Sequence, residues 1–365
     1  MRSTSAVARE SSTPVLAVVP SLAAAGVRGG NIRLSNRRRL LWLTVLLAAL
    51  ILVSLLSLAV GARSINLPTV ADALLNFDPS NGDHAVVRSR IVRTVAGLLV
   101  GLSLGLAGTS MQGVARNPLA DPGILGVNAG ASLAVVAGIF FFGATSVSNY
   151  LWFAFLGSAI AAVVVYAVAS LGRSGATPVK LALAGAAMAA GMGSLMSAML
   201  VSSQDSLELF RRWQVGALAG KSWDAIVAVL PFVVVGALVL LGTGKLLNTL
   251  ALGDDMARGL GQRPGMGRAI SALGIVLLCG SATALAGPIA FIGLVVPHLL
   301  RGLVGPDYRW LLPLSLIAAP AILLLADVIG RVILLPGEVP AGILAAMLGA
   351  PVFIAVVRRG KQAEL

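Results

Sequence analysis

Metal-binding side chains are scarce in this chain. Its 365 residues include two histidines, His84 and His298, and one cysteine, Cys279. They stand far apart along the sequence, whereas metal ligands usually form a set of closely spaced His, Cys and carboxylate residues. Cys279 lies inside a long apolar segment with no second cysteine to pair with, so we interpret it as a packing residue. These residues predict no metal site.

One short motif bears on nucleotide chemistry. Gly244-Lys245 has the last glycine and the lysine of a phosphate-binding loop, but Val239 occupies the place of its first glycine and Leu246 that of its Ser or Thr. The backbone cradle and the magnesium-binding hydroxyl are therefore both incomplete. No Ser–His–Asp set or carboxylate pair stands where an aqueous cleft would form. The sequence predicts no enzyme, a membrane-embedded enzyme included, and no cofactor bound by this chain.

Asp327 and Arg331 are the ionisable residues that come closest to the inside of an apolar segment. They are four residues apart, about one helical turn, so their side chains can pair. Carriers coupled to protons or sodium usually place an ionisable side chain near the middle of the membrane. No charged residue lies deep in any apolar segment here, which counts against such a carrier.

Long apolar segments must position all of these residues. About 20 apolar residues are needed for one helical crossing of a bilayer. Eight segments contain no Asp, Glu, Lys or Arg: Leu40–Ala62, Thr94–Ala115, Pro122–Gly172, Leu181–Gln204, Ala225–Gly244, Ala269–Leu300, Trp310–Ala326 and Val339–Val357. The sequence therefore predicts an all-α polytopic membrane protein.

Two of these segments are long enough to cross twice. Pro122–Gly172 is far too long for one crossing, and we expect a turn near Asn149. In Ala269–Leu300 a break at Gly287-Pro288 would separate a helix of about 18 residues from a short one over Ile289–Leu300, because proline interrupts helical hydrogen bonding. The total is ten crossings. A count of nine crossings would place Arg331 and the C-terminal basic cluster on the faces opposite to those that ten crossings give them.

Basic residues set the orientation. With ten crossings, 19 of the 27 Lys and Arg residues fall in the segments on one side, and the whole net charge of +13 falls there too. Basic loops stay in the cytoplasm, so both ends of the chain are cytoplasmic. The strong positive charge thus reflects the membrane topology and does not indicate nucleic-acid binding. We expect a disordered cytoplasmic tail over 1–36, one membrane domain over 37–359 and a short tail over 360–365.

Glycine is frequent within the predicted spans. Gly97, Gly101 and Gly105 repeat every four residues, which places them on one helix face, and Gly108 follows. Small residues on one face let a neighbouring backbone approach closely. We expect tight helix packing there, and similarly around Gly185 and at Gly191-Met192-Gly193 in the fifth span.

The cytoplasmic segment between spans six and seven contains a candidate contact for a partner. Residues 252–262 read as a short amphipathic helix bounded by glycines, with acids at its start that suit the positive end of the helix dipole. An ordinary interfacial helix is the competing interpretation. Asp255-x-Ala257-x-x-x-Gly261 is similar to the coupling motif by which ABC importer permeases dock on their ATPases.

Four further blocks of sequence resemble the iron-siderophore, haem and vitamin B12 permeases, which are type II ABC importers. The resemblance covers about residues 40–358. The blocks are Arg90-Ile-Val-Arg93-Thr94, Gln112–Ala131, Gly287–Arg301 and Ala326–Pro351. The chain departs from the family pattern at Val92, where proline is usual, and at Asp254-Asp255, where Glu is common.

The resemblance implies three groups of site residues. Arg90, Arg93 and Arg331 would dock a substrate-binding protein outside, although Arg90 and Arg93 could simply anchor a helix end. Asp254, Asp255, Met256, Ala257, Arg258, Leu260 and Gly261 would couple to the ATPase. Ser174, Gly175, Ala176, Thr177 and Pro178 would form the cytoplasmic gate, where a plain tight turn is the alternative.

The resemblance also implies a function and a set of partners. The chain would be the permease subunit of an importer in the bacterial cytoplasmic membrane, with ferric siderophores as cargo and haem or vitamin B12 as alternatives. Its partners would be an ATPase dimer that binds ATP and magnesium, a substrate-binding protein, and a second permease, either a copy of itself or a homologue. The pathway would run between the two permeases. A secondary transporter that works alone is the alternative from another class.

Overall fold

The computed structural model describes residues 36–144, 147–171 and 177–362, and all regular secondary structure within these ranges is helical. Residues 1–35 and 363–365, most of the two predicted tails, lie outside the described residues. The first helix begins at Asn36 and the last ends at Gln362, close to the predicted limits of the membrane domain.

The described helices agree with ten crossings. Seven are long and apolar enough to cross a membrane, and three shorter apolar helices accompany them. The seven are α1 (Asn36–Ala59), α3 (Gly82–Ala115), α5 (Val147–Ser170), α6 (Pro178–Ser202), α8 (Trp223–Gly242), α11 (Pro264–Ala286) and α13 (Tyr308–Val332). The three are α4 (Val127–Phe142), α12 (Ile292–Val304) and the apolar part, Ala341–Ile354, of α14 (Ala341–Gln362).

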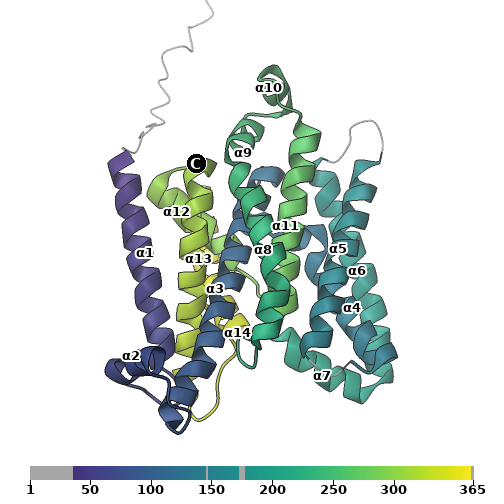
Figure 1. The fold of residues 1–365 in the computed structure, drawn as a ribbon. Coiled ribbons are helices and arrows are strands. Elements are labelled where there is room, and N and C mark those ends of the chain that lie inside the picture. The colour runs from purple at the N-terminus through teal and green to yellow at the C-terminus, as the bar shows by residue number, and fades with distance from the viewer. Residues whose placement is uncertain (1–35, 145–146, 172–176, 363–365) are drawn as a thin grey trace, which may run out of the picture. The chain divides into compact units, whose positions relative to one another are not determined.

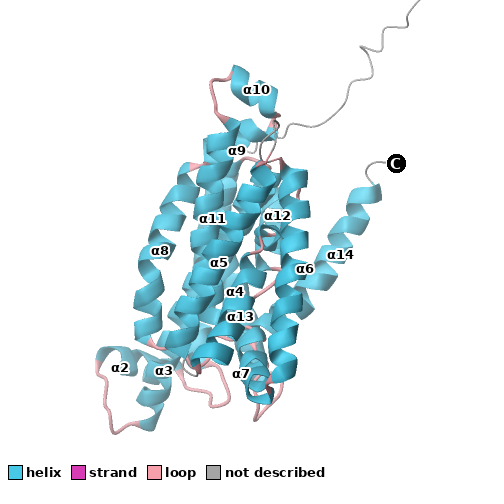
Figure 2. Cartoon of the chain, turned by 90° about the vertical axis from the view of Figure 1, so that its right-hand side faces the viewer, coloured by secondary structure: helices cyan, strands magenta, loops and turns pink. Residues whose placement is uncertain are grey.

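Short helices lie at the two ends of the spans. They are α2 (Leu67–Leu75), the 3₁₀ helix η2 (Pro122–Leu125), α7 (Gln204–Gln214), α9 (Gly244–Ala251) and α10 (Asp254–Gly259). Both views place α10 at one end and α2 and α7 at the other (Figures 1 and 2). Helix α1 begins and α14 ends on the side of α10 (Figure 1), as the predicted topology requires.

One predicted turn is misplaced and one break is confirmed. The turn expected near Asn149 lies earlier, because α4 ends at Phe142 and Gly143 follows with φ +61°, a left-handed conformation that suits glycine. Asn149 lies in the first turn of α5. The break at Gly287-Pro288 is confirmed, since α11 ends at Ala286 and α12 starts at Ile292.

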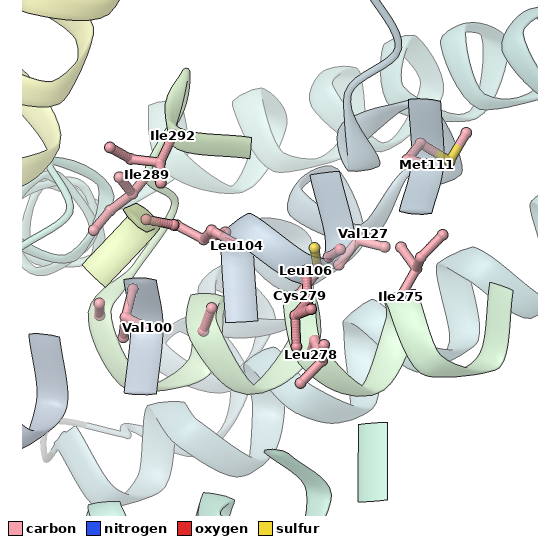
Figure 3. Close-up of a cluster of buried hydrophobic side chains, with 14 of the residues drawn as sticks. Val100, Leu104, Leu106, Met111, Val127, Ile275, Leu278, Cys279, Ile289 and Ile292 are labelled. Atoms are coloured by element: carbon pink, nitrogen blue, oxygen red, sulfur yellow. The ribbon is translucent and has the colours of Figure 1, made fainter. Parts of the chain in front are cut away.

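Helix α3 lies at the centre of the packing. It contacts α13, α11, α12, α8 and α1, and its apolar window is largely buried. Its side chains Val100, Leu104 and Leu106 lie in one buried cluster with Ile275, Leu278 and Cys279 of α11 (Figure 3). Cys279 is 3% exposed, which confirms its role in packing.

The glycine face of α3 is the surface on which neighbouring helices approach. Gly101 lies against the backbone of Pro320 and Gly105 against that of Ser315, both in α13. Gly108 lies against the backbone of Gly293 in α12, too close for any side chain. The predicted close packing is confirmed for α3. Within the described part of this chain it is not seen at Gly191 and Gly193 of α6, where no atom lies within 4 Å of the place that a Cβ would occupy.

Gly108→Ala tests the close approach of α3 and α12. The added methyl group would overlap the carbonyl of Gly293, so we expect a loss of about 1–3 kcal/mol in the free energy of unfolding. The measurement is denaturant unfolding of the purified chain in detergent. Gly302→Ala in α12 is the matched control, because nothing lies within 4 Å of that position, and we expect unchanged or slightly higher stability. Equal effects of the two substitutions would contradict the packing of α3.

Candidate functional site

A basic cavity lies at the end of the bundle opposite α10. Its volume is about 410 Å³, and α3 and α13 form part of its wall together with three loops. Its charged lining residues are Arg63, Arg90, Arg93, Lys221, Arg331 and Glu338. The three predicted docking arginines therefore lie together, on the predicted outer side. Five basic residues against one acid make this an electropositive site.

A buried carboxylate joins two of these arginines. Arg93 donates from Nε and Nη2 to both oxygens of Asp327, at 2.9 and 2.8 Å. Arg331 donates from Nε to Asp327 Oδ2 at 3.0 Å, so the predicted pair between these two residues is confirmed. Asp327 is 0% exposed and Arg331 1% exposed. This single carboxylate hydrogen-bonds to both guanidinium groups and balances one of their two positive charges inside the protein.

The network extends to α1 and to the loop after α13. Arg331 also donates to the carbonyl of Ser57 at 2.6 Å and to its hydroxyl at 3.0 Å. The Ser57 hydroxyl bonds in turn to that of Thr94, at 2.7 Å. At the rim, Arg93 Nη1 pairs with Glu338 at 2.6 Å. Helices α1, α3 and α13 therefore meet in one polar cluster.

Arg90 binds backbone carbonyls instead of a carboxylate. Its Nη1 donates to the carbonyls of Leu58 and Ala59, both at 2.9 Å, and its Nη2 donates to that of Arg63. These groups lie at and just beyond the end of α1, where carbonyls have no partner within the helix. Arg90 therefore caps α1 and is 8% exposed. The predicted anchoring of a helix end is seen here, and the docking role stays a prediction.

The opposite end carries the predicted coupling helix. Helix α10 spans Asp254–Gly259, shorter than the predicted 252–262, with Gly253 before it and Gly261 just after its C-cap Leu260. Gly261 has φ +78°, a conformation that disfavours any residue with a side chain. The amide of Gln262 donates to the carbonyl of Ala257 at 2.9 Å and closes the turn.

The predicted coupling residues divide into an inner and an outer set. Ala257 is fully buried, and Asp254 points back towards the bundle. Asp255 is fully exposed and pairs with Arg258 at 2.7 Å. The outer set, open to a partner, is Asp255, Met256, Arg258 and Leu260.

Asp254 attaches the coupling helix to two spans. Its carboxylate accepts from Arg268 of α11 at 2.7 and 3.0 Å and pairs with Arg116, which follows the last residue of α3. Sequence reasoning missed Arg116 and Arg268. The signal for Arg116 was its place in the Gln112–Ala131 block, but spacing alone could not show its distant partner.

The predicted gate falls mostly outside the described residues. Ser174, Gly175 and Ala176 are in the undescribed range 172–176. Thr177 is the N-cap of α6, where its hydroxyl accepts from the amide of Lys180 at 3.4 Å, and Pro178 is the first residue of the helix. The gating role of these residues stays a prediction.

Metal-binding side chains do not gather in the part of the chain that the structure describes, where no group of three or more His, Cys, Asp or Glu could hold an ion. His84 is 2% exposed, and its Nδ1 accepts from the amide of Asp78 at 3.0 Å. His84 lies in the first turn of α3, and this hydrogen bond holds the loop between α2 and α3 in place.

Comparison with known proteins identifies relatives over nearly the whole chain. The profile of the FecCD transport family matches residues 47–359. The ferric enterobactin transport system permease protein FepD of Escherichia coli (strain K12) is 46% identical over 315 residues, covering 86% of this chain and 94% of that protein. The probable siderophore transport system permease protein YfiZ of Bacillus subtilis (strain 168) is 43% identical, covering 80% and 87%.

A solved structure has a similar fold. It is an inward-facing conformation of a metal-chelate type ABC transporter, with a TM-score of 0.77 and 26% sequence identity. The match covers 88% of this chain and 99% of that chain.

Asp327→Asn tests the buried network. The change removes the negative charge between Arg93 and Arg331, so we expect a loss of about 3–5 kcal/mol in the free energy of unfolding. Denaturant unfolding in detergent, followed by tryptophan fluorescence, measures it. Glu338→Gln is the control, because Glu338 is 38% exposed and its ion pair is worth about 1 kcal/mol or less. A similar loss in both variants would contradict the central role of Asp327.

Asp254→Asn tests the attachment of α10. Loss of its charge weakens the bonds to Arg116 and Arg268, so we expect the backbone amides of residues 254–262 to exchange hydrogen about tenfold faster. Hydrogen exchange measured by mass spectrometry reports this directly. Asp255→Asn changes the neighbouring, fully exposed carboxylate and should leave exchange unchanged. Unchanged exchange in Asp254→Asn would show that these ion pairs do not hold the helix.

Proposed function

The chain belongs to the FecCD transport family, and we propose that it is the permease subunit of an ATP-driven importer of ferric siderophores. The observation that carries the proposal is the match to the ferric enterobactin permease over 86% of this chain. The second relative is named as a siderophore permease, which supports the same cargo over haem or vitamin B12. The protein is a multi-pass protein of the cytoplasmic membrane and acts in translocation.

An ATPase would dock on the outer set of α10. Met256 is 59% exposed and Leu260 56% exposed, beside the charged pair Asp255–Arg258. An apolar centre with a charged rim is the usual composition of a protein interface. Asp254 and Ala257 attach the helix to the bundle, so a movement of α10 would be transmitted to α3 and α11. ATP and magnesium would bind to the ATPase subunits.

A substrate-binding protein would dock over the basic cavity. Acidic residues on its surface would be attracted by the positive cavity, which chiefly speeds and orients association. The network around Asp327 would keep the arginines in place during docking. This position lies opposite α10, so cargo delivery and ATP binding would act on the two ends of the same spans.

A second permease would pack against α6. Only about a tenth of this span's apolar window is buried, and Gly191 and Gly193 leave room for another backbone. Leu183, Leu195 and Val201 are exposed along the helix. The pathway would lie between two such faces, with residues 174–178 as the cytoplasmic gate. ATP binding would move α10 and switch access from one side to the other.

Met256→Asp with Leu260→Asp tests the ATPase contact. Two carboxylates in the centre of the interface would be desolvated without partners, so we expect ATP-driven uptake of ferric enterobactin to fall at least about tenfold. The chain is purified in mild detergent from its own membranes, co-purifying subunits are identified by mass spectrometry, and uptake is measured after reconstitution. The double variant should also lose the ATPase subunit.

Leu75→Asp is the control for this experiment. Leu75 is 81% exposed at the end of α2, on the opposite side of the bundle, so uptake and subunit composition should not change. Full ATP-driven uptake by the Met256→Asp, Leu260→Asp variant would exclude α10 as the ATPase contact.

A further inference from the structure

An apolar groove lies between α5 and α11 in the membrane-spanning part of the bundle. Its volume is about 380 Å³, and it shares no lining residue with the basic cavity. The two helices contact each other, and both views show them side by side (Figures 1 and 2). Among the described residues that line the groove, only Tyr166 has a polar side chain. The groove can therefore hold an apolar group but offers almost no hydrogen-bond partners.

The groove is open because small side chains line both of its walls. Ala159 and Ala162 of α5 and Ala269 and Ala272 of α11 contribute only methyl groups. On each helix the two alanines stand three residues apart, which puts them on the same face. Leu273, beside them in the lining, is 56% exposed. The groove therefore opens on the outer surface of the bundle.

The depth of the groove matches one leaflet of a membrane. Its lining on α5 runs from Phe155 to Ala167, and α5 ends at Ser170 on the side of α10. Helix from Phe155 to Ala167 rises about 18 Å, compared with about 15 Å for half of a bilayer core. The distribution of basic residues makes the side of α10 cytoplasmic. The groove thus lies in the inner leaflet, where acyl chains are the apolar molecules that can fill it.

A cation stands at the cytoplasmic end of the groove. The hydroxyl of Tyr166 donates to the carbonyl of Gly265 at 3.5 Å and marks this end. Arg263 precedes Gly265, occupies the N-cap position of α11 and is exposed. It lies about 9 Å along the helix axis from Ala269, the first residue of α11 in the lining. Arg263 is therefore at the level of the headgroups of lipids whose chains reach the groove.

Arg263 differs from its basic neighbours at this end because it has no partner among the described residues. Arg116 and Arg268 share Asp254, and Lys180 donates to a backbone carbonyl. The guanidinium of Arg263 has no ion pair and no hydrogen bond within the described part of the chain. A guanidinium presents parallel donors that match the oxygens of a phosphate. Anionic lipids of the cytoplasmic leaflet are attracted to basic residues in such positions.

We propose that the groove between α5 and α11 is a binding site for an anionic phospholipid of the inner leaflet. One acyl chain lies in the groove, and the phosphate lies against Arg263. The inference goes beyond the proposed function and does not depend on the cargo or on the ATPase. Helix α11 also carries Arg268, which holds α10 through Asp254, so the lipid supports the span to which the coupling helix is attached.

Photolabelling locates the lipid. The transporter is purified together with its other subunits and placed in nanodiscs that contain a trace of phosphatidylglycerol with a photoreactive diazirine on one acyl chain. After irradiation, mass spectrometry of the digested chain identifies the labelled residues. We expect labels to concentrate in 155–167 and 269–277, at least about fivefold above the exposed residues of α1.

Filling the groove tests the acyl chain. Ala159→Leu with Ala272→Leu occupies the groove and keeps both spans apolar, so the chain should fold. Each buried methylene of a lipid chain adds to binding, so we expect labelling of the groove and affinity for phosphatidylglycerol to fall at least about tenfold. Native mass spectrometry of the delipidated transporter, titrated with lipid, measures the affinity. Ala48→Leu makes the same kind of change at an exposed position of α1 and should have no effect.

Arg263→Gln tests the headgroup. Affinity is compared for phosphatidylglycerol and for phosphatidylcholine with the same acyl chains. The wild type should bind phosphatidylglycerol about fivefold more tightly, because one basic residue at the membrane surface contributes about that factor. Arg263→Gln should bind the two lipids equally. Lys245→Gln removes another exposed cytoplasmic cation, on α9 and outside the groove, and should keep the preference.

Three results would overturn the proposal. Even labelling of all lipid-exposed helices, or wild-type affinity in the filled-groove variant, would show only the general lipid layer around the bundle. Labelling of the groove in the isolated chain but not in the assembled transporter would show that another subunit covers it. Equal affinity of the wild type for the two lipids would exclude Arg263 as the headgroup contact. Each of these results leaves the importer function standing.

Discussion

The carboxylate of Asp327 is the group on which the outer half of the structure depends. Side chains in a bilayer cannot satisfy their polar groups with water, so they must find partners within the protein. Asp327 accepts from Arg93 of α3 and Arg331 of α13, and Arg331 continues to Ser57 of α1. Three spans that are distant in sequence are thereby fixed at one point, and the shape of the basic cavity follows from that point.

Helix α3 connects this cluster to the cytoplasmic end. It is 34 residues long, and Arg90 and Arg93 lie near its outer end while Arg116 follows its inner end. The backbones of α12 and α13 contact its glycine face directly, so α3 has little room to move relative to these two helices. Arg116 then reaches Asp254 of the coupling helix. One helix therefore positions the groups proposed to meet the binding protein and those proposed to meet the ATPase.

Local pattern predicted the spans, the break at Gly287, the pairing of Asp327 with Arg331 and the glycine face of α3, because each depends on residues close in sequence. It misplaced the turn near Asn149, since the left-handed conformation of Gly143 ends α4 earlier. It could not predict that Arg93 shares Asp327, that Asp254 faces inward, or that Lys221 enters the cavity. These contacts join residues far apart in the chain, and only the packed structure brings them together.

Uptake of radioactive ferric enterobactin into vesicles that contain the purified transporter tests the central claim most directly. An ATP-driven permease predicts uptake that requires ATP on the side of α10, requires the binding protein on the other side, and persists when ion gradients are removed. Uptake without ATP that follows a proton or sodium gradient would contradict it, and the chain would then be a carrier that works alone.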